Sequence, residues 1–88
     1  MFKVNYTKKA FKNLSKIDNG QQKLILAWIE KNLESCDEPR KYGKPLKGQL
    51  KSYWTYRVGD YRIIVDIIDE NITILVINIS HRKNVYKK

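Results

Sequence analysis

The sequence predicts an α+β domain with the order β-α-α-β-β-β, in which a helical hairpin covers one face of a mainly antiparallel four-stranded sheet. Two observations carry this prediction. Apolar residues recur at helical spacing between residues 8 and 36, and they then alternate or form continuous runs between 53 and 80. Such a change of hydrophobic period marks a change from helix to strand. With 88 residues we expect one domain, 1–88, with one modest core.

The N-terminal residues supply the first strand and the first helix. Residues 2–7, FKVNYT, alternate apolar and polar side chains, which is typical of a strand. Thr7 can cap the following helix, KKAFKNLSKID, in which apolar residues fall at helical spacing and the lysines face water.

A second amphipathic helix is expected over QQKLILAWIEKNLESC, 21–36, because Asn19-Gly20 breaks the first helix and Asn19 with Gln22 resembles a capping box. Residues 37–50 contain two Pro and two Gly, which predicts a loop. From 40 to 51 the chain carries no acid and these cations: Arg40, Lys41, Lys44, Lys47 and Lys51.

Three strands follow the loop. SYWTYRV, YRIIVDII and ITILVINIS are rich in β-branched and aromatic residues. Gly59-Asp60 separates the first pair of strands and residues 69–71 separate the second, so two successive hairpins are predicted. The last two strands are apolar on both faces, which favours central places in the sheet.

Charge and cysteine content limit the possible functions. Eighteen Lys and Arg against nine Asp and Glu give a net charge of +9, which favours nucleic acid or an acidic protein as the partner. One Cys and one His exclude an internal disulfide and a structural zinc site, and we expect no metal and no other cofactor. Without an apolar leader or an 18-residue apolar run, a soluble, cytoplasmic protein that does not bind membranes is expected.

The hairpins gather cations at one end of the sheet. If the last hairpin turns about Glu70, Arg62 lies opposite Asn78 and close to the C-terminal residues. Arg57, at the end of the preceding strand, reaches the same end. The groups expected there are Arg57, Arg62, His81, Arg82, Lys83 and Tyr86.

These groups suit cleavage of RNA without a metal. In that reaction the ribose 2′-OH attacks the adjacent phosphate and leaves a 2′,3′-cyclic phosphate. It needs a proton acceptor, a proton donor and cations that hold the charge on phosphorus. Histidine and tyrosine can transfer protons, and arginines can hold phosphate oxygens in pairs.

The sequence resembles the RelE/ParE superfamily of bacterial toxins from type II toxin–antitoxin systems. The element order and three segments carry the resemblance: LKG (46–48), YWTYRVGDYRIIVDI (53–67) and HRKNVY (81–86). It covers nearly the whole chain and implies a single RelE-like toxin domain. The RelE-like branch comprises ribosome-dependent endoribonucleases that cut mRNA in the A site. The resemblance therefore implies this activity, with mRNA, the ribosome and a cognate antitoxin as partners.

The resemblance also assigns roles to residues. It implies that Arg62 of DYR and Arg82 of HR bind and polarise the scissile phosphate, and that Tyr86 stacks on or orients the substrate. At the position of His81 some relatives carry a proton-transferring histidine and others a lysine. His81 is therefore the first choice for the general base and Tyr86 the second. Contacts to RNA or the ribosome are expected from Lys47, Lys51, Arg57, Lys83 and Lys87.

Two alternatives stay open. Some RelE members carry catalytic lysines on the strand where this chain has Tyr53 and Thr55, so this chain departs from their pattern. The ParE-like branch inhibits DNA gyrase and cuts no RNA, and a non-catalytic RNA-binding module is the third possibility. The presence of His81, Arg82 and Tyr86 together favours the nuclease, since a gyrase inhibitor needs no proton-transfer groups.

Overall fold

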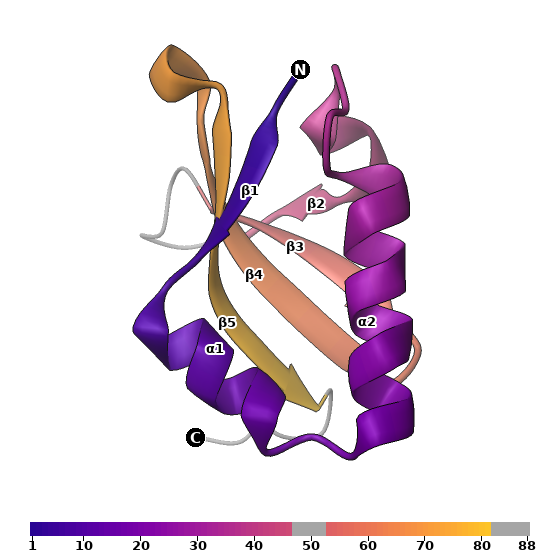
Figure 1. The fold of residues 1–88 in the computed structure, drawn as a ribbon. Coiled ribbons are helices and arrows are strands. Elements are labelled where there is room, and N and C mark those ends of the chain that lie inside the picture. Colours follow the sequence, from indigo (N-terminus) through magenta and orange to yellow (C-terminus); the bar gives the residue numbers. More distant parts are fainter. Residues whose placement is uncertain (47–52, 82–88) are drawn as a thin grey trace.

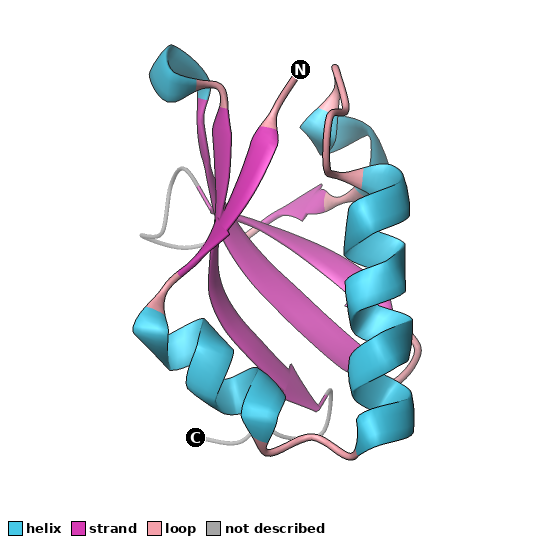
Figure 2. Ribbon diagram, viewed as in Figure 1, coloured by secondary structure: helices cyan, strands magenta, loops and turns pink. Residues whose placement is uncertain are grey.

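A computed structural model describes residues 1–46 and 53–81 of the chain. Two helices lie on one side of a twisted sheet and diverge from each other across it (Figures 1 and 2). The elements are β1 (Lys3–Tyr6), α1 (Lys8–Ser15), α2 (Asn19–Asn32), the 3-10 turn η1 (Pro39–Tyr42), β2 (Lys44–Pro45), β3 (Tyr53–Val58), β4 (Tyr61–Ile68), the 3-10 turn η2 (Asp69–Asn71) and β5 (Thr73–His81). Within these two ranges, no helix is both long enough and apolar enough to span a bilayer.

The sheet has the order β1-β5-β4-β3-β2. β1 pairs with β5 in parallel, and the other neighbours are antiparallel. The predicted α+β class and the central places of the last two long strands are confirmed. The two-residue strand β2 lies in the segment predicted as a loop, because two residues are too few to show a period of two.

The helix caps are partly as predicted. The Thr7 hydroxyl accepts a hydrogen bond from the Ala10 amide at 3.1 Å, so this cap is confirmed. The second helix already begins at Asn19, and its cap is Asp18, whose carboxylate accepts from the Gly20 amide at 3.3 Å. The capping box predicted from Asn19 is therefore wrong by one residue. A carboxylate at the N-cap also interacts favourably with the helix dipole.

One core joins the helices to the sheet. α1 contacts β1 and β5, whereas α2 contacts β3. The fully or nearly fully buried apolar residues of this core are Ala10, Leu14, Ile25, Ile29, Leu33, Tyr56, Val58, Ile63, Val65, Ile67, Ile74, Val76 and Ile79. In β4 these are the odd-numbered residues, so the even-numbered ones, Arg62 among them, face away from both helices.

Candidate functional site: a cationic pocket on the uncovered sheet face

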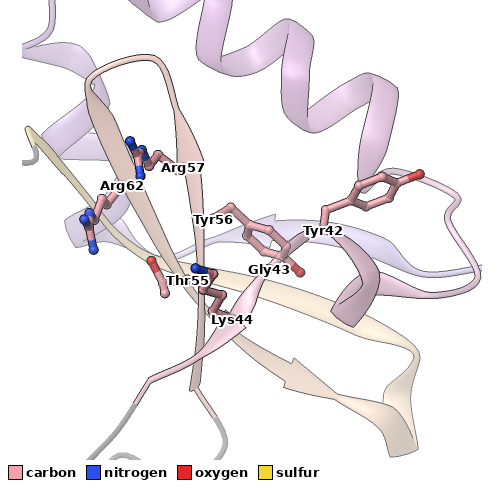
Figure 3. A pocket seen from close by; sticks show the side chains of 7 residues that line it. All are labelled: Tyr42, Gly43, Lys44, Thr55, Tyr56, Arg57 and Arg62. Carbon is pink, nitrogen blue, oxygen red and sulfur yellow. The ribbon is translucent and has the colours of Figure 1, made fainter.

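Two arginines lie side by side on the sheet face that points away from the helices. Arg57 of β3 is directly opposite Arg62 of β4, and Thr55 pairs with Lys44 of β2, so all four residues share this face. They surround a cavity of about 160 Å³ (Figure 3). Its lining residues are Tyr42, Gly43, Lys44, Thr55, Tyr56, Arg57 and Arg62.

The arrangement of these cations favours an anion between them. Like charges directly opposite each other in a sheet are destabilising. Arg57 is exposed, whereas Arg62 is half-buried and its Nε atom is buried. A bound anion would offset the repulsion, and guanidinium groups match phosphate oxygens in a bidentate geometry. The cavity is smaller than ordinary small-molecule sites of roughly 300–1,000 Å³, so it suits one small anionic group such as a phosphate.

The wall of this pocket depends on a close approach at Gly43. A Cβ atom at this position would lie 2.8 Å from Tyr56 Cε1 and 2.9 Å from the Thr55 carbonyl oxygen. The Tyr56 hydroxyl donates a buried hydrogen bond of 2.6 Å to the Pro39 carbonyl. Burial raises the pKa of Tyr56 above its ordinary value, so this phenol stays neutral and serves to position η1.

An ion pair also holds η1, the turn that leads into this wall of the pocket. The Arg40 guanidinium donates to both carboxylate oxygens of Asp69, at 2.8 and 3.3 Å, and lies 5.9 Å from the centroid of the Trp54 ring. The pair therefore links η1 to η2. Hydrogen bonding to Arg40 lowers the pKa of Asp69 below its ordinary value.

The Arg40–Asp69 pair predicts a pH-dependent effect of Asp69→Asn on stability. Because the folded-state pKa of Asp69 is lowered, its contribution is fully present above the unfolded pKa and disappears as the pH falls through the folded pKa. Urea unfolding at a series of pH values should show a small deficit for the variant at pH 7 that vanishes in acid. A deficit of constant size would contradict this role.

His81 lies at the same end of the sheet but on its other face. It pairs with Tyr61 across the strands, next to the Arg62–Ser80 pair, and its ring meets the Tyr61 ring at 79° with centroids 5.2 Å apart. It borders a cavity of about 260 Å³ lined by Asn13, Lys16, Ile17, Tyr61, Ile79, Ser80 and His81. The structure thus brings Arg57 and Arg62 together and separates His81 from them by the thickness of the sheet.

The predicted register of the last hairpin is wrong by two residues. Arg62 pairs with Ser80, not with Asn78. The connection after β4 includes Ile72, which has a φ of 50°, and a β-bulge inserts Ile77 into β5. A shift of two preserves the facing of every side chain, so Arg62 still points to the predicted face.

Part of the predicted site lies outside the described residues. This applies to Arg82, Tyr86, Lys47, Lys51, Lys83 and Lys87. Sequence reasoning did not place Tyr42, Gly43 and Lys44 at the site. Lys44 belongs to the noted run of cations, but its position beside Thr55 follows from β2, which carries no sequence signal of its own.

Comparisons with known proteins agree on one family. The sequence of residues 4–86 matches the protein family described as the ParE toxin of type II toxin–antitoxin systems (parDE). Toxin RelG of Mycobacterium tuberculosis is 28% identical in an alignment of 88 positions, which covers 99% of this chain and 98% of RelG.

Solved structures that resemble this chain include complexes of RelE toxins with their antitoxins. The toxin–antitoxin complex RelBE2 from Mycobacterium tuberculosis is matched at 28% identity with a TM-score of 0.83, over 92% of this chain and 91% of that chain. For the RelB–RelE complex from Methanococcus jannaschii the identity is 29% and the TM-score 0.72, over 96% of both chains. Since the family model spans almost all of the sequence and the fold agrees, this chain belongs to the ParE toxin family of type II toxin–antitoxin systems, within the RelE/ParE superfamily.

Proposed function

We propose that this protein is a ribosome-dependent endoribonuclease that cuts mRNA in the A site without a metal ion. The observation that carries the proposal is the Arg57–Arg62 pair, which lines a phosphate-sized pocket on the uncovered face of the sheet. The similarity to RelG and to RelE toxins supports the nuclease branch of the superfamily. Since its substrate would be message bound to ribosomes, the protein would act in the cytoplasm.

The reaction would begin with attack of the 2′-OH on the adjacent phosphorus. The O2′–P bond forms, the P–O5′ bond breaks, and the products are a 2′,3′-cyclic phosphate and a 5′-OH. One group takes the proton of the 2′-OH and another protonates the leaving O5′. Arg62 and Arg82 would hold the phosphate oxygens, with Arg57 as a further cation, because negative charge on these oxygens grows in the transition state.

His81 is our first choice for the general base and Tyr86 the second. Because His81 lies on the helix-covered face, its imidazole can reach the phosphate held by Arg62 only if the RNA crosses the end of β5 near Ser80. The ribosome would hold the message in that path, which explains why free RNA should be a poor substrate.

His81→Gln should slow cleavage at saturating ribosome concentration and flatten its pH dependence near neutrality, because the variant lacks a proton-transferring imidazole. Glutamine keeps polar atoms of similar reach but cannot exchange a proton at these pH values. Single-turnover rates between pH 6 and 8 provide the measurement. An unchanged rate and pH profile would exclude His81 and leave Tyr86 as the candidate.

A cognate antitoxin is the second proposed partner. The similar structures from Mycobacterium tuberculosis and Methanococcus jannaschii are complexes of a toxin with its antitoxin. With a net charge of +9, an acidic antitoxin segment would be attracted to the cationic pocket and would compete there with the phosphate of the message.

Cleavage of message in programmed 70S ribosomes, compared with the same RNA free in solution, tests the proposal. Primer extension should show cuts within the A-site codon at a rate at least about 100-fold above that of free RNA, because positioning supplies much of the acceleration. Equal rates on both substrates would contradict ribosome dependence. RNA binding without any cleavage would indicate a non-catalytic module.

Inhibition of DNA gyrase is the second candidate function. It is favoured by the match of residues 4–86 to the ParE toxin family, because the ParE-like branch of the superfamily inhibits gyrase. It predicts gyrase-dependent double-strand breaks in plasmid DNA and no cuts in ribosome-bound message. The same protein preparation should therefore be assayed on both substrates.

A further inference from the structure

A row of uncharged side chains lies directly beside the arginine pair on the uncovered face of the sheet. Thr55 of β3 pairs with Ile64 of β4, and Ile64 pairs with Asn78 of β5. All three are partly buried, and they share the face of Arg62 because cross-strand partners point to the same side. This Thr55–Ile64–Asn78 row is two residues along the strands from the Arg57–Arg62 pair, which is roughly 7 Å.

A β-bulge puts Asn78 into this row. Val76 is buried in the core, so strict alternation along β5 would also bury Asn78 and would leave Ile79 on the uncovered face. The extra residue Ile77 reverses the alternation, so that Ile79 is buried and the polar Asn78 lies on the uncovered face. Bulges are common next to active sites, where they redirect a side chain. The position of Asn78 is therefore consistent with a binding role.

The polar groups of the row are available to a ligand. Within residues 1–46 and 53–81, no hydrogen-bond partner is found for the Thr55 hydroxyl or for the Asn78 side-chain amide. The side-chain amides of Asn13 and Asn32, by contrast, are hydrogen-bonded to the backbone. Thr55 also lines the cationic pocket (Figure 3). The row thus offers donors and acceptors on both sides of one apolar residue, next to the phosphate-sized pocket.

The charge along the uncovered face changes in an order that suits one nucleotide. The Arg57–Arg62 pair comes first, the uncharged row follows, and the next position along β4 on this face is Asp66. A phosphate is attracted by the arginines and repelled by the carboxylate of Asp66, so a phosphodiester backbone is disfavoured beyond the pair. An uncharged base can pack on Ile64 without this penalty.

We propose that the Thr55–Ile64–Asn78 row binds the base of a nucleotide that flanks the scissile phosphate, and that it prefers adenine. The inference rests on the proposed function and names part of its substrate. One nucleotide can span the distance from the Arg57–Arg62 pair to the row. Neighbouring strands are roughly 4.8 Å apart, so a base over Ile64 has its edges near Thr55 and Asn78. An asparagine amide accepts from N6 and donates to N7 of adenine, whereas guanine has two acceptors on that edge.

Ribosome-bound messages that differ only in the two bases flanking the cut test this preference. The wild-type protein should cut at least about fivefold faster when adenine occupies one of these positions, which is the lower range of discrimination by a bidentate contact. Asn78→Ala should lower the rate on the adenine message to that on the others, and Thr55→Val should reduce the preference in part. Asn5→Ala removes the same amide from the same face at β1 and should keep the preference.

Urea unfolding of each variant controls for the fold. Equal wild-type rates with all four bases at both positions would overturn the inference. A full adenine preference in folded Asn78→Ala would overturn it as well.

A binding measurement separates this inference from the proposed function. The dinucleotides ApA and GpG with a 2′-deoxy group on the first sugar cannot undergo attack by a 2′-OH, so NMR titration of the free protein reports binding alone. ApA should bind at least about fivefold more tightly than GpG. Asn78→Ala should abolish this difference, and Arg62→Ala should weaken both dinucleotides by the same factor.

The two hypotheses can fail separately. If ApA is preferred but ribosome-bound message is not cut, the proposed function fails and the base site stands. If message is cut but both dinucleotides bind equally, the base site fails and the proposed function stands. An equal loss of affinity for both dinucleotides in Asn78→Ala would show that Asn78 does not read the base and would also overturn the inference.

Discussion

Replacement of Arg62 by alanine should lower the cleavage rate of ribosome-bound message by about 100- to 1,000-fold, the usual loss when one stabilising donor is removed from a transition state. Arg62 is half-buried on a central strand, and its buried Nε limits the positions that its guanidinium can take. Pre-organisation of this kind makes a cation more effective than a solvated one. Single-turnover cleavage at saturating ribosome concentration measures the effect.

Two matched variants sharpen this prediction. Arg57→Ala removes the same charge from the exposed partner and should cost less, whereas Arg62→Lys keeps the charge but loses the bidentate geometry and should recover only part of the rate. Urea unfolding of each variant controls for the fold. Full activity of a folded Arg62→Ala variant would remove this residue from the mechanism.

Gly43→Ala should destabilise the protein by about 1–3 kcal/mol and weaken cleavage as well. The added methyl group would meet the Tyr56 ring and the Thr55 carbonyl oxygen at less than 3 Å, so the segment from Tyr42 to Lys44 must move away from β3. This movement would open one wall of the cationic pocket.

Gly20→Ala is the matched control for this substitution. Only the Asp18 side chain lies near the new methyl group, at 3.8 Å, and the position is helical, so alanine should leave stability unchanged or raise it by about 0.4–1 kcal/mol. Wild-type stability in Gly43→Ala would show that η1 and β2 can shift without cost and would contradict the role of Gly43.

The fold could be predicted from the sequence because hydrophobic periodicity changes clearly at two places, after the first strand and after the loop at residues 37–50. Helical spacing gave α1 and α2, and the β-branched runs gave β3, β4 and β5. The register of the last hairpin could not be obtained in the same way. ITILVINIS is apolar on both faces, so no alternation distinguishes one register from another or reveals the bulge at Ile77.

The candidate site was predictable where it follows from a tight turn. Gly59, with a φ of 60°, makes the two-residue turn that places Arg57 opposite Arg62. The alternation of β5 also separates Ser80 from His81, so the position of His81 on the other face agrees with the pattern. The pocket wall at Gly43 depends on a long-range contact with Tyr56, which no local pattern reports.

The most direct test of the mechanism uses a message with a single 2′-deoxynucleotide at the cut position in the A site of programmed ribosomes. If the Arg57–Arg62 pair holds a phosphate that the neighbouring 2′-OH attacks, cleavage at that position should be lost. The all-ribose message should be cut to a 2′,3′-cyclic phosphate end. Continued cleavage of the deoxy-substituted message, or a 3′-OH end on the all-ribose product, would contradict the account.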